Sequence, residues 1–381
     1  MTLMPLSGKR FAVDYFLTGS ESHARTMAER LCADQTIEAP PSLLLSCPVP
    51  PGLLGALEDF RREDDGRYRA RISFPVELFG HSVAQLLHTV FGTASLTPNI
   101  QVADIHLPAH PPDGWSGPRV GIPGIRRMTQ VFDRPLVCAV LKPLGLPPDA
   151  LAELARTFAL AGVDMIKDDQ GLGDHFFCPF EERVQRCVAS IRDASRSTGR
   201  ACLYFPHVAG SLDDIRNQAQ FAKQAGADGI LLSPGLVGYQ ALHDLSRHPT
   251  EALPIMSHPA FLGTYAITPT QGLAPSVLYG QLPRLAGADI TIYPTYGLTS
   301  PISRPDCALI ASACTESWGP LLPIFPTAAS RMGEDRISEM CALYGHEFVF
   351  ILGSQIRGTS DGIVAACRRF MQSLSKLSAA H

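Results

Sequence analysis

Two lysines stand out as candidates for proton-transfer chemistry. The chain contains five lysines, at positions 9, 142, 167, 223 and 376, against 27 arginines. Arginine is therefore the usual surface cation of this protein. Lys142 and Lys167 each follow a short apolar run. A buried lysine can lose its proton and act as a base or nucleophile, which arginine cannot. We therefore take Lys142 and Lys167 as candidate catalytic residues.

Acidic residues lie directly beside one of these lysines. Lys167 is followed by Asp168, Asp169 and Gln170. Because successive residues of a strand point to opposite faces, Lys167 and Asp169 are expected on the same face. The pair could hold a hard divalent cation only if the lysine supplied an oxygen ligand. Reaction of the lysine amine with CO2 would give a carbamate, which has such an oxygen. The alternative is structural: the two lysines would only form ion pairs with Asp168 and Asp169.

Lys142 and Lys167 belong to a series of short apolar runs that are separated by helical patterns. Eight such runs follow residue 134. Parallel strands buried on both faces need no polar alternation, so this order predicts an α/β fold with a (β/α)8 TIM barrel. The expected strands are Pro135–Lys142, Val163–Asp169, Ala201–Val208, Gly229–Pro234, Leu253–His258, Asp289–Thr295, Leu322–Thr327 and Phe348–Ser354. The expected crossover helices are Pro148–Leu160, Phe180–Ser197, Leu212–Ala225, Ser276–Leu285, Cys307–Glu316 and Asp361–Leu377, and the patterns for the fourth and seventh helices are the weakest.

The C-terminal ends of these strands are the expected place for chemistry, because barrel enzymes build their active sites there. The polar residues at these ends are Lys142, Lys167, Asp168, Asp169, Gln170, His207, Ser233, His258, Tyr293, Thr295, Thr327, Ser330, Arg331, Gly353 and Ser354. Gly353 and Ser354 precede the last helix and could present backbone N–H groups to one phosphate. A simple strand-to-helix turn is an equally good interpretation of these two residues.

The first 130 residues show a different pattern, which predicts a smaller α+β domain. The expected elements are a strand Phe11–Leu17, a helix His23–Cys32, a charged β segment Tyr68–Leu78 and a helix Val83–Val90. The segment Pro111–Gly124 is rich in proline and glycine, so it is the expected linker. We therefore predict an N-terminal domain over residues 1–125 and a catalytic barrel domain over residues 126–381.

Composition excludes several classes of protein. The net charge is −4 and only 18% of residues are charged, which offers no footprint for nucleic acid or an anionic membrane. The ten cysteines include no Cys-x-x-Cys pair, so we expect buried thiols in a reducing compartment and no zinc site. There is no signal-peptide pattern and no uncharged apolar run of about 18 residues. A cytoplasmic location is expected.

Several ordered motifs resemble those of ribulose-bisphosphate carboxylase large chains and their rubisco-like relatives. The resemblance covers nearly the whole chain. The segments that carry it are Ala33–Thr36, Gly92-Thr93, Leu141–Leu146, Gly162–Gln170, His258, Ala288–Gly297, Pro326–Met332 and Gly353-Ser354. It implies a (β/α)8 barrel preceded by a smaller α+β, ferredoxin-like N-terminal domain.

The resemblance also implies roles for the residues at the barrel mouth. Lys142 would match the catalytic lysine that moves protons at the enolisable carbon. Lys167 would match the lysine that becomes a carbamate and binds Mg2+, with Asp169 as the aspartate ligand and Gln170 at the position of a glutamate ligand. His258 would match the histidine that contacts the substrate at the reacting centre.

Further residues would bind the substrate. Ser330, Gly353 and Ser354 lie in the segments that carry phosphate-binding groups in the family. Asp34 and Thr93 take the places of a glutamate and an asparagine that a neighbouring subunit normally contributes. The resemblance therefore implies a homodimer.

The departures from the family argue against carboxylation of ribulose bisphosphate. Gln170 replaces a glutamate, which removes one negative charge from the metal position. Leu144 stands where the second lysine of a Lys-Pro-Lys motif is expected, and Pro259 where an arginine is expected. The strand-six region lacks the family's histidine, and Gly297–Arg304 contains no lysine for a flexible lid. The losses fall on the groups that would bind two phosphates and process a carboxylated product.

Three functions remain open. The first is a rubisco-like enzyme that carries out Mg2+-assisted enolisation, isomerisation or decarboxylation of a small oxidised sugar or sugar phosphate through an enolate. The second is metal-free proton transfer by Lys142 with His258. The third is a catalytically silent binding protein on the same fold. Retention of two barrel lysines in so lysine-poor a chain favours an enzyme.

Overall fold

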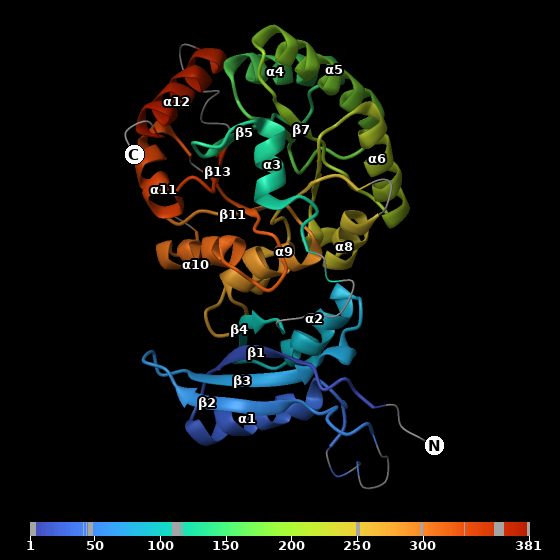
Figure 1. Cartoon of the computed structure of the whole chain (residues 1–381), viewed down its shortest axis with the longest axis vertical. Helices are drawn as coiled ribbons and strands as arrows, with labels where there is room; N and C mark the ends of the chain where they lie inside the picture. The colour runs from blue at the N-terminus through green and yellow to red at the C-terminus, as the bar shows by residue number, and fades with distance from the viewer. Residues whose placement is uncertain are drawn as a thin grey trace.

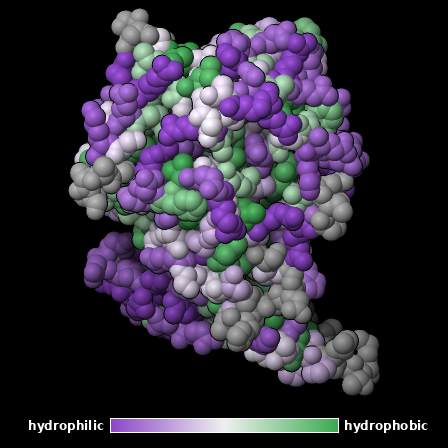
Figure 2. Space-filling model, turned by 45° about the horizontal axis from the view of Figure 1, so that its top comes forward, coloured by the Kyte–Doolittle hydropathy of each residue, from purple (hydrophilic) through white to green (hydrophobic). Residues whose placement is uncertain are grey.

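The computed structural model of the chain has two parts, an N-terminal sheet domain and a barrel (Figure 1). The structure describes residues 5–40, 42, 44, 49–108, 115, 117–248, 252–297, 300–330, 332–353 and 362–378. Hydrophilic side chains cover most of the face drawn in Figure 2, and hydrophobic ones form small patches between them. Within the described residues, no helix has the length and apolar character that a membrane span requires.

The N-terminal domain is built on a five-stranded sheet with the order β10-β4-β1-β3-β2. Its strands and helices are β1 (Arg10–Leu17), α1 (Glu21–Asp34), β2 (Ala56–Arg62), β3 (Tyr68–Pro75), α2 (Val83–Phe91) and β4 (Ile100–His106). The four elements expected here from the sequence are confirmed, except that the expected β segment Tyr68–Leu78 ends at Pro75 and Val76–Leu78 form a short 3-10 helix. The expectations did not include β2 and β4; β2 is short of apolar residues, so its sequence, ALEDFRR, gives little strand signal.

The fifth strand of this sheet comes from the barrel. β10 (Gly272–Leu273) pairs in parallel with Gln101 and Val102 of β4. Gly272 has a φ of +97°, and a Cβ at this position would lie 2.1 Å from the carbonyl oxygen of Tyr265, so only glycine fits. The Gln281 side chain accepts from the Ile105 N–H at 3.0 Å and donates to the Ile105 carbonyl, also at 3.0 Å. The two domains are therefore joined by backbone pairing as well as by packing.

The eight expected barrel strands are confirmed within the described residues. They are β5 (Leu136–Leu141), β6 (Met165–Asp168), β7 (Leu203–Phe205), β8 (Ile230–Leu232), β9 (Ile255–Ser257), β11 (Ile290–Pro294), β12 (Phe325–Ala329) and β13 (Val349–Leu352). They form two four-stranded parallel sheets, β13-β5-β6-β7 and β12-β11-β9-β8. A parallel bridge between His207 and Leu231 joins β7 to β8, and β12 packs against β13, so the barrel closes.

Helices surround the strands as a ring (Figure 1). They are α4 (Pro148–Ala161), α5 (Phe180–Thr198), α6 (Leu212–Ala225), α8 (Tyr239–Arg247), α9 (Leu282–Ala286), α10 (Arg304–Thr315), α11 (Ile337–Tyr344) and α12 (Ile363–Ser378). The positions with the weakest helical patterns, the fourth and the seventh, hold α8 and α11. The expected helix Ser276–Leu285 is divided into a π-helical stretch, Val277–Gln281, followed by α9.

A helix that the sequence did not predict covers the barrel end opposite the active-site end. α3 (Gly121–Thr129) buries Ile122 and Ile125 in a second apolar core with the first residues of the barrel strands, such as Leu136 and Met165. Asp289 accepts hydrogen bonds from the backbone of Val120 and Gly121 at 2.8 and 2.7 Å. The last four residues of the expected linker, 121–124, are therefore helical. The predicted domain boundary at 125/126 lies within α3, and the division into two domains at this point stays a prediction.

Candidate active site

A cavity of about 460 Å3 lies at the C-terminal ends of the barrel strands. Its lining includes six of the residues predicted from the sequence: Lys142, Lys167, Gln170, His258, Ser330 and Gly353. Apolar residues complete the wall: Val140, Ile292, Ala329, Met332 and Ile351. Ser354 lies outside the described residues. The barrel thus brings together side chains from segments that are far apart in the sequence.

Lys142 follows β5 and makes an ion pair with Asp169, which follows β6. The Lys142 Nζ lies 2.6 Å from Asp169 Oδ2. The other carboxylate oxygen of Asp169 accepts from the backbone N–H of Gly171 at 3.0 Å. The Lys142 side chain is 38% exposed, whereas that of Asp169 is 10% exposed. A buried carboxylate is therefore held next to the cavity with a partly solvated cation as its partner.

Lys167 is more deeply buried, with 2% of its surface exposed. Its Nζ donates to the carbonyl oxygen of Asp168 at 3.0 Å. Burial lowers the pKa of Lys167 because the charged form loses solvation, and the positive charge of Lys142 lowers it further, while Cys138 and Asp169 oppose the shift. The buried environment therefore favours the neutral amine, which is the form that can react with CO2.

Asp168 points away from the cavity, as the strand alternation predicts. Its carboxylate pairs with Arg183 of α5, with Arg183 Nε 3.0 Å from Asp168 Oδ2, and accepts from the Tyr204 hydroxyl at 2.8 Å. Both side chains of this ion pair are 0% exposed. Burial alone would lower the pKa of Arg183, but Asp168, Tyr204 and Cys178 together outweigh burial and raise it. The alternative in which both lysines pair with both aspartates is therefore wrong for Asp168, whereas Lys142 does pair with Asp169.

Sequence reasoning missed Arg183. Besides Asp168, its guanidinium donates to the carbonyl oxygens of Gly173 at 2.9 Å and Cys178 at 3.2 Å. These contacts fix the segment that follows Asp169 and Gln170. The only available signal was an arginine on an amphipathic helix, next to Glu182 and near Arg186, and such a residue is normally exposed.

His258 follows β9 and contributes an imidazole to the cavity. Its Nδ1 accepts from the backbone N–H of Ala260 at 3.1 Å, so the neutral ring carries its proton on Nε2. Burial lowers the pKa of His258 to about 2, and the positive charge of Lys142 adds to the effect. A neutral imidazole of this kind can donate a hydrogen bond to a substrate oxygen but does not carry a charge.

Two predicted residues lie elsewhere in the chain. Asp34 and Thr93 line a separate cavity of about 320 Å3 in the N-terminal domain. The Thr93 hydroxyl donates to the side-chain oxygen of Gln35 at 2.8 Å, and Asp34 pairs with Arg30 at 3.5 Å. Within one chain these residues do not join the barrel cavity. That they complete the site of a second subunit stays a prediction.

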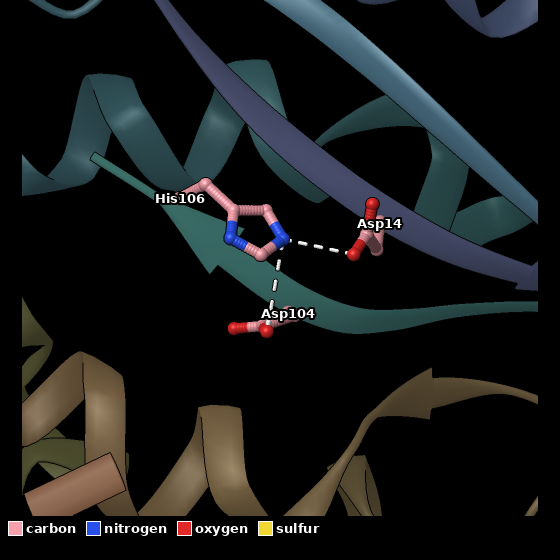
Figure 3. Close-up of side chains that lie close together, drawn as sticks. All are labelled: Asp14, Asp104 and His106. Carbon is pink, nitrogen blue, oxygen red and sulfur yellow. Dashed lines mark hydrogen bonds and ion pairs between the residues drawn. The ribbon is translucent and has the colours of Figure 1, made fainter. Parts of the chain in front are cut away.

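A second group of acidic and histidine side chains lies on the N-terminal sheet: Asp14, Asp104 and His106 (Figure 3). Asp104 and His106 line a cavity of about 830 Å3 between this sheet and the barrel. Asp14 already accepts hydrogen bonds from Arg69, Arg71 and His106. These bonds outweigh the effect of burial and hold the pKa of Asp14 well below its usual range. Two guanidinium groups on one carboxylate do not suit a cation site.

Comparison with known proteins places the chain in a family. Residues 121–299 match the family described as ribulose bisphosphate carboxylase large chain, catalytic domain. The chain is 34% identical to ribulose bisphosphate carboxylase-like protein 1 of Rhodopseudomonas palustris over 362 residues, which cover 95% of this chain and 96% of that protein. The chain belongs to the rubisco-like proteins. The resemblance seen in the sequence motifs is thereby confirmed.

Two proteins similar to this rubisco-like protein are named for activities other than carboxylation. The chain is 32% identical to a 5-methylthioribulose-1-phosphate isomerase of Rhodospirillum rubrum, over 96% of each chain. It is 31% identical to a 2,3-diketo-5-methylthiopentyl-1-phosphate enolase of Bacillus pumilus, over 82% of this chain and 78% of that protein. The expectation of a rubisco-like enzyme of the enolase or isomerase type is therefore confirmed at the level of the family.

Solved structures support the same fold. The crystal structure of a rubisco-like protein from Rhodopseudomonas palustris matches with a TM-score of 0.87 and 32% identity, over 97% of this chain and 99% of that chain. An archaeal rubisco matches with the same TM-score of 0.87 at 22% identity, over 99% of this chain and 93% of that chain. At that lower identity the likeness establishes only the shared fold.

Proposed function

We propose that this rubisco-like protein is an enzyme that enolises, isomerises or decarboxylates a small oxidised sugar phosphate with the help of Mg2+. One observation carries the proposal: two lysines and a histidine line one barrel cavity, and a buried carboxylate lies 2.6 Å from one of the lysines. The substrates in the names of the isomerase and the enolase relatives are both sugar-derived monophosphates with an enolisable carbon. We propose a substrate of this class.

The residues at the mouth of the barrel fit a magnesium ion. Lys167 has a buried amine whose environment favours the neutral form, so CO2 can convert it to a carbamate oxygen ligand. Asp169 and Gln170 add a carboxylate and an amide oxygen, and oxygen atoms are the ligands that Mg2+ prefers. Lys167, Asp169 and Gln170 would hold the ion. When bound, Mg2+ supplies a Lewis acid that polarises a substrate carbonyl and stabilises the negative charge of an enolate.

The remaining residues have distinct tasks. Lys142, once separated from Asp169 and with one ammonium proton released to solvent, takes the proton from the carbon next to the carbonyl, and the C–H electron pair becomes the double bond of the enolate. The Nε2–H of His258 donates to a substrate oxygen. Ser330 and Gly353 lie on the loops after β12 and β13, where backbone and hydroxyl groups can receive the phosphate. Asp34 and Thr93 of a second copy would complete the site in a homodimer.

A metal-free variant of the same reaction is the second candidate. Gln170 favours it, because a neutral amide in place of a carboxylate weakens the attraction for a cation. In this variant Lys142 and His258 alone transfer the proton, and Lys167 keeps its amine.

The test is hydrogen exchange at the enolisable carbon. The protein, saturated with bicarbonate and Mg2+, is incubated in D2O with 5-methylthioribulose 1-phosphate or 2,3-diketo-5-methylthiopentyl 1-phosphate, and 1H NMR follows loss of the signal next to the carbonyl. We expect exchange with at least one substrate. Lys142→Ala should slow it by about 1,000-fold, because a positioned acid or base contributes on this scale. Lys9→Ala, which changes an exposed lysine, is the matched control.

Addition of EDTA separates the two candidates. Loss of exchange supports the Mg2+ enzyme, and unchanged exchange supports the metal-free variant. A correctly folded protein that exchanges neither substrate would instead favour a binding protein on this fold.

A further inference from the structure

A short turn carries the proposed metal ligands Asp169 and Gln170. We call residues 169–172 the ligand turn. It is closed by a hydrogen bond from the Leu172 N–H to the Asp169 carbonyl at 2.9 Å, and within it the Gly171 N–H donates to Asp169 Oδ1 at 3.0 Å. The direction of the Asp169 carboxylate therefore depends on the shape of this turn. At its far end, Leu172 is 0% exposed.

His207 contacts that far end. Its Nδ1 lies 3.1 Å from the Leu172 carbonyl oxygen. A carbonyl oxygen can only accept, so Nδ1 carries the proton and donates it to the ligand turn. Burial lowers the pKa of His207 and keeps the ring neutral, which leaves Nε2 as an acceptor facing the hydroxyl of Ser233 at 3.4 Å. His207 therefore donates from Nδ1 to the ligand turn, and its Nε2 accepts from Ser233, the residue that follows β8.

The backbone of His207 is itself firmly held. Its N–H donates to Asp168 Oδ2 at 3.1 Å, and the residue forms a parallel bridge with Leu231. The next residue, Val208, donates to the Leu231 carbonyl at 3.0 Å. His207 is 3% exposed and does not line the cavity, so it is not placed to touch substrate. Its side chain links a rigid pair of strands to a turn that no strand holds.

We infer that His207 is a positioning residue that sets the ligand turn, and through it the oxygen atoms of Asp169 and Gln170, for binding a divalent cation. The inference rests on the proposed function. Loss of the outer hydrogen bonds that orient metal ligands weakens metal binding by about tenfold or more, and the bond from His207 to Leu172 acts on these ligands through the turn. Ser233, by donating to Nε2, keeps the proton of His207 on Nδ1.

Three variants separate this role from a general contribution to stability. His207→Asn keeps a donor, because the asparagine Nδ2 is the same number of bonds from Cα as the histidine Nδ1. His207→Gln places its nitrogen at the position of Nε2 instead, which cannot replace the bond to Leu172. His207→Leu removes both nitrogens.

Titration calorimetry with MgCl2 in bicarbonate buffer measures the cation affinity of each folded variant. We expect His207→Asn to bind within about twofold of the wild type, and His207→Gln and His207→Leu to bind about tenfold more weakly. Thermal unfolding of the same samples reports stability separately. If His207→Leu does not fold, the Mg2+ affinities of His207→Asn and His207→Gln are enough to test the inference.

Two results would overturn the inference. Equal affinity in the Asn and Gln variants, whether unchanged or reduced, would show that the bond to Leu172 does not set the ligands, while the metal site itself would stand. Absence of Mg2+ binding by the wild-type protein would contradict both the positioning role and the magnesium enzyme.

Discussion

Two clusters in this protein place aspartates next to cations, and they differ in how completely the carboxylate is occupied. On the N-terminal sheet, Asp14 of β1 lies directly across from Arg71 of β3 and accepts hydrogen bonds from Arg71 and Arg69. It also accepts from His106 (Figure 3). At the barrel mouth, Asp169 has the partly exposed Lys142 and one backbone N–H. Neighbouring strands fix the first set of partners, whereas the second includes a lysine on a flexible stem.

The comparison shows what separates a structural carboxylate from one available for chemistry. Asp14 is fully occupied by donors that strand pairing holds in place, so no cation can approach it without breaking two guanidinium contacts. Asp169 has one charged partner, the partly exposed ammonium group of Lys142. Both carboxylates are buried, so burial alone does not distinguish them; the number of their charged partners does.

The largest expected difference is in stability. Asp14→Asn should lower the free energy of unfolding by about 2 kcal/mol, because it weakens the charge-assisted hydrogen bonds that this buried carboxylate accepts from Arg69 and Arg71. Asp169→Asn should leave the stability nearly unchanged, because its lysine partner can turn to solvent, but should abolish Mg2+ binding. Urea unfolding and calorimetry measure the two effects. Similar stability losses in both variants would remove the distinction between the clusters.

A negative charge added at position 170 should increase the difference in cation binding between the barrel mouth and the Asp14 cluster. Gln170→Glu adds an anionic oxygen ligand, so Mg2+ affinity should rise by about tenfold and should depend on bicarbonate if Lys167 is carbamylated. Titrations with and without bicarbonate measure both properties. Equal Mg2+ affinity with and without bicarbonate would argue against a carbamate on Lys167.

Removal of the Lys142 charge tests whether Mg2+ must displace this lysine from Asp169. Lys142→Met leaves the chain length of the side chain similar but removes the charge, so Mg2+ no longer has to displace an ammonium group from Asp169. A partly exposed ion pair contributes up to about 1 kcal/mol, so Mg2+ should bind up to about fivefold more tightly. Lys9→Met is the control for loss of a lysine far from the site. Weaker binding in Lys142→Met would mean that the lysine supports the ion rather than competing with it.

The smallest effect is expected in acid. The pKa of Asp14 is depressed in the folded protein, so its contribution to stability is present above the unfolded pKa near 4 and is lost as pH falls toward the folded value. Between pH 5 and pH 3 the wild type should therefore lose roughly 1 kcal/mol that Asp14→Asn does not lose. Urea unfolding at the two pH values gives the difference. An equal loss in both proteins would assign the acid sensitivity to other carboxylates.

The barrel strands and the lysines at their ends follow from local sequence. Each strand is a short apolar run, and Lys142 and Lys167 come directly after two of these runs, so their placement at one end of a parallel barrel needs only the chain order. The alternation of strand residues also separates Asp168 from Asp169. These features depend on neighbours within a few residues, which a single sequence displays.

Other features depend on contacts between distant segments, and only the tertiary structure decided them. The burial of Arg183 against Asp168, the packing of α3 beneath the barrel and the addition of β10 to the N-terminal sheet each join residues that no local pattern connects. An arginine on a helix or a glycine before a leucine has many possible partners, and packing selects one. By contrast, the sequence by itself determined that two lysines and an aspartate meet at the barrel mouth. Which lysine pairs with Asp169, and that His207 contacts its turn, depended on side-chain distances that exist only in the folded chain.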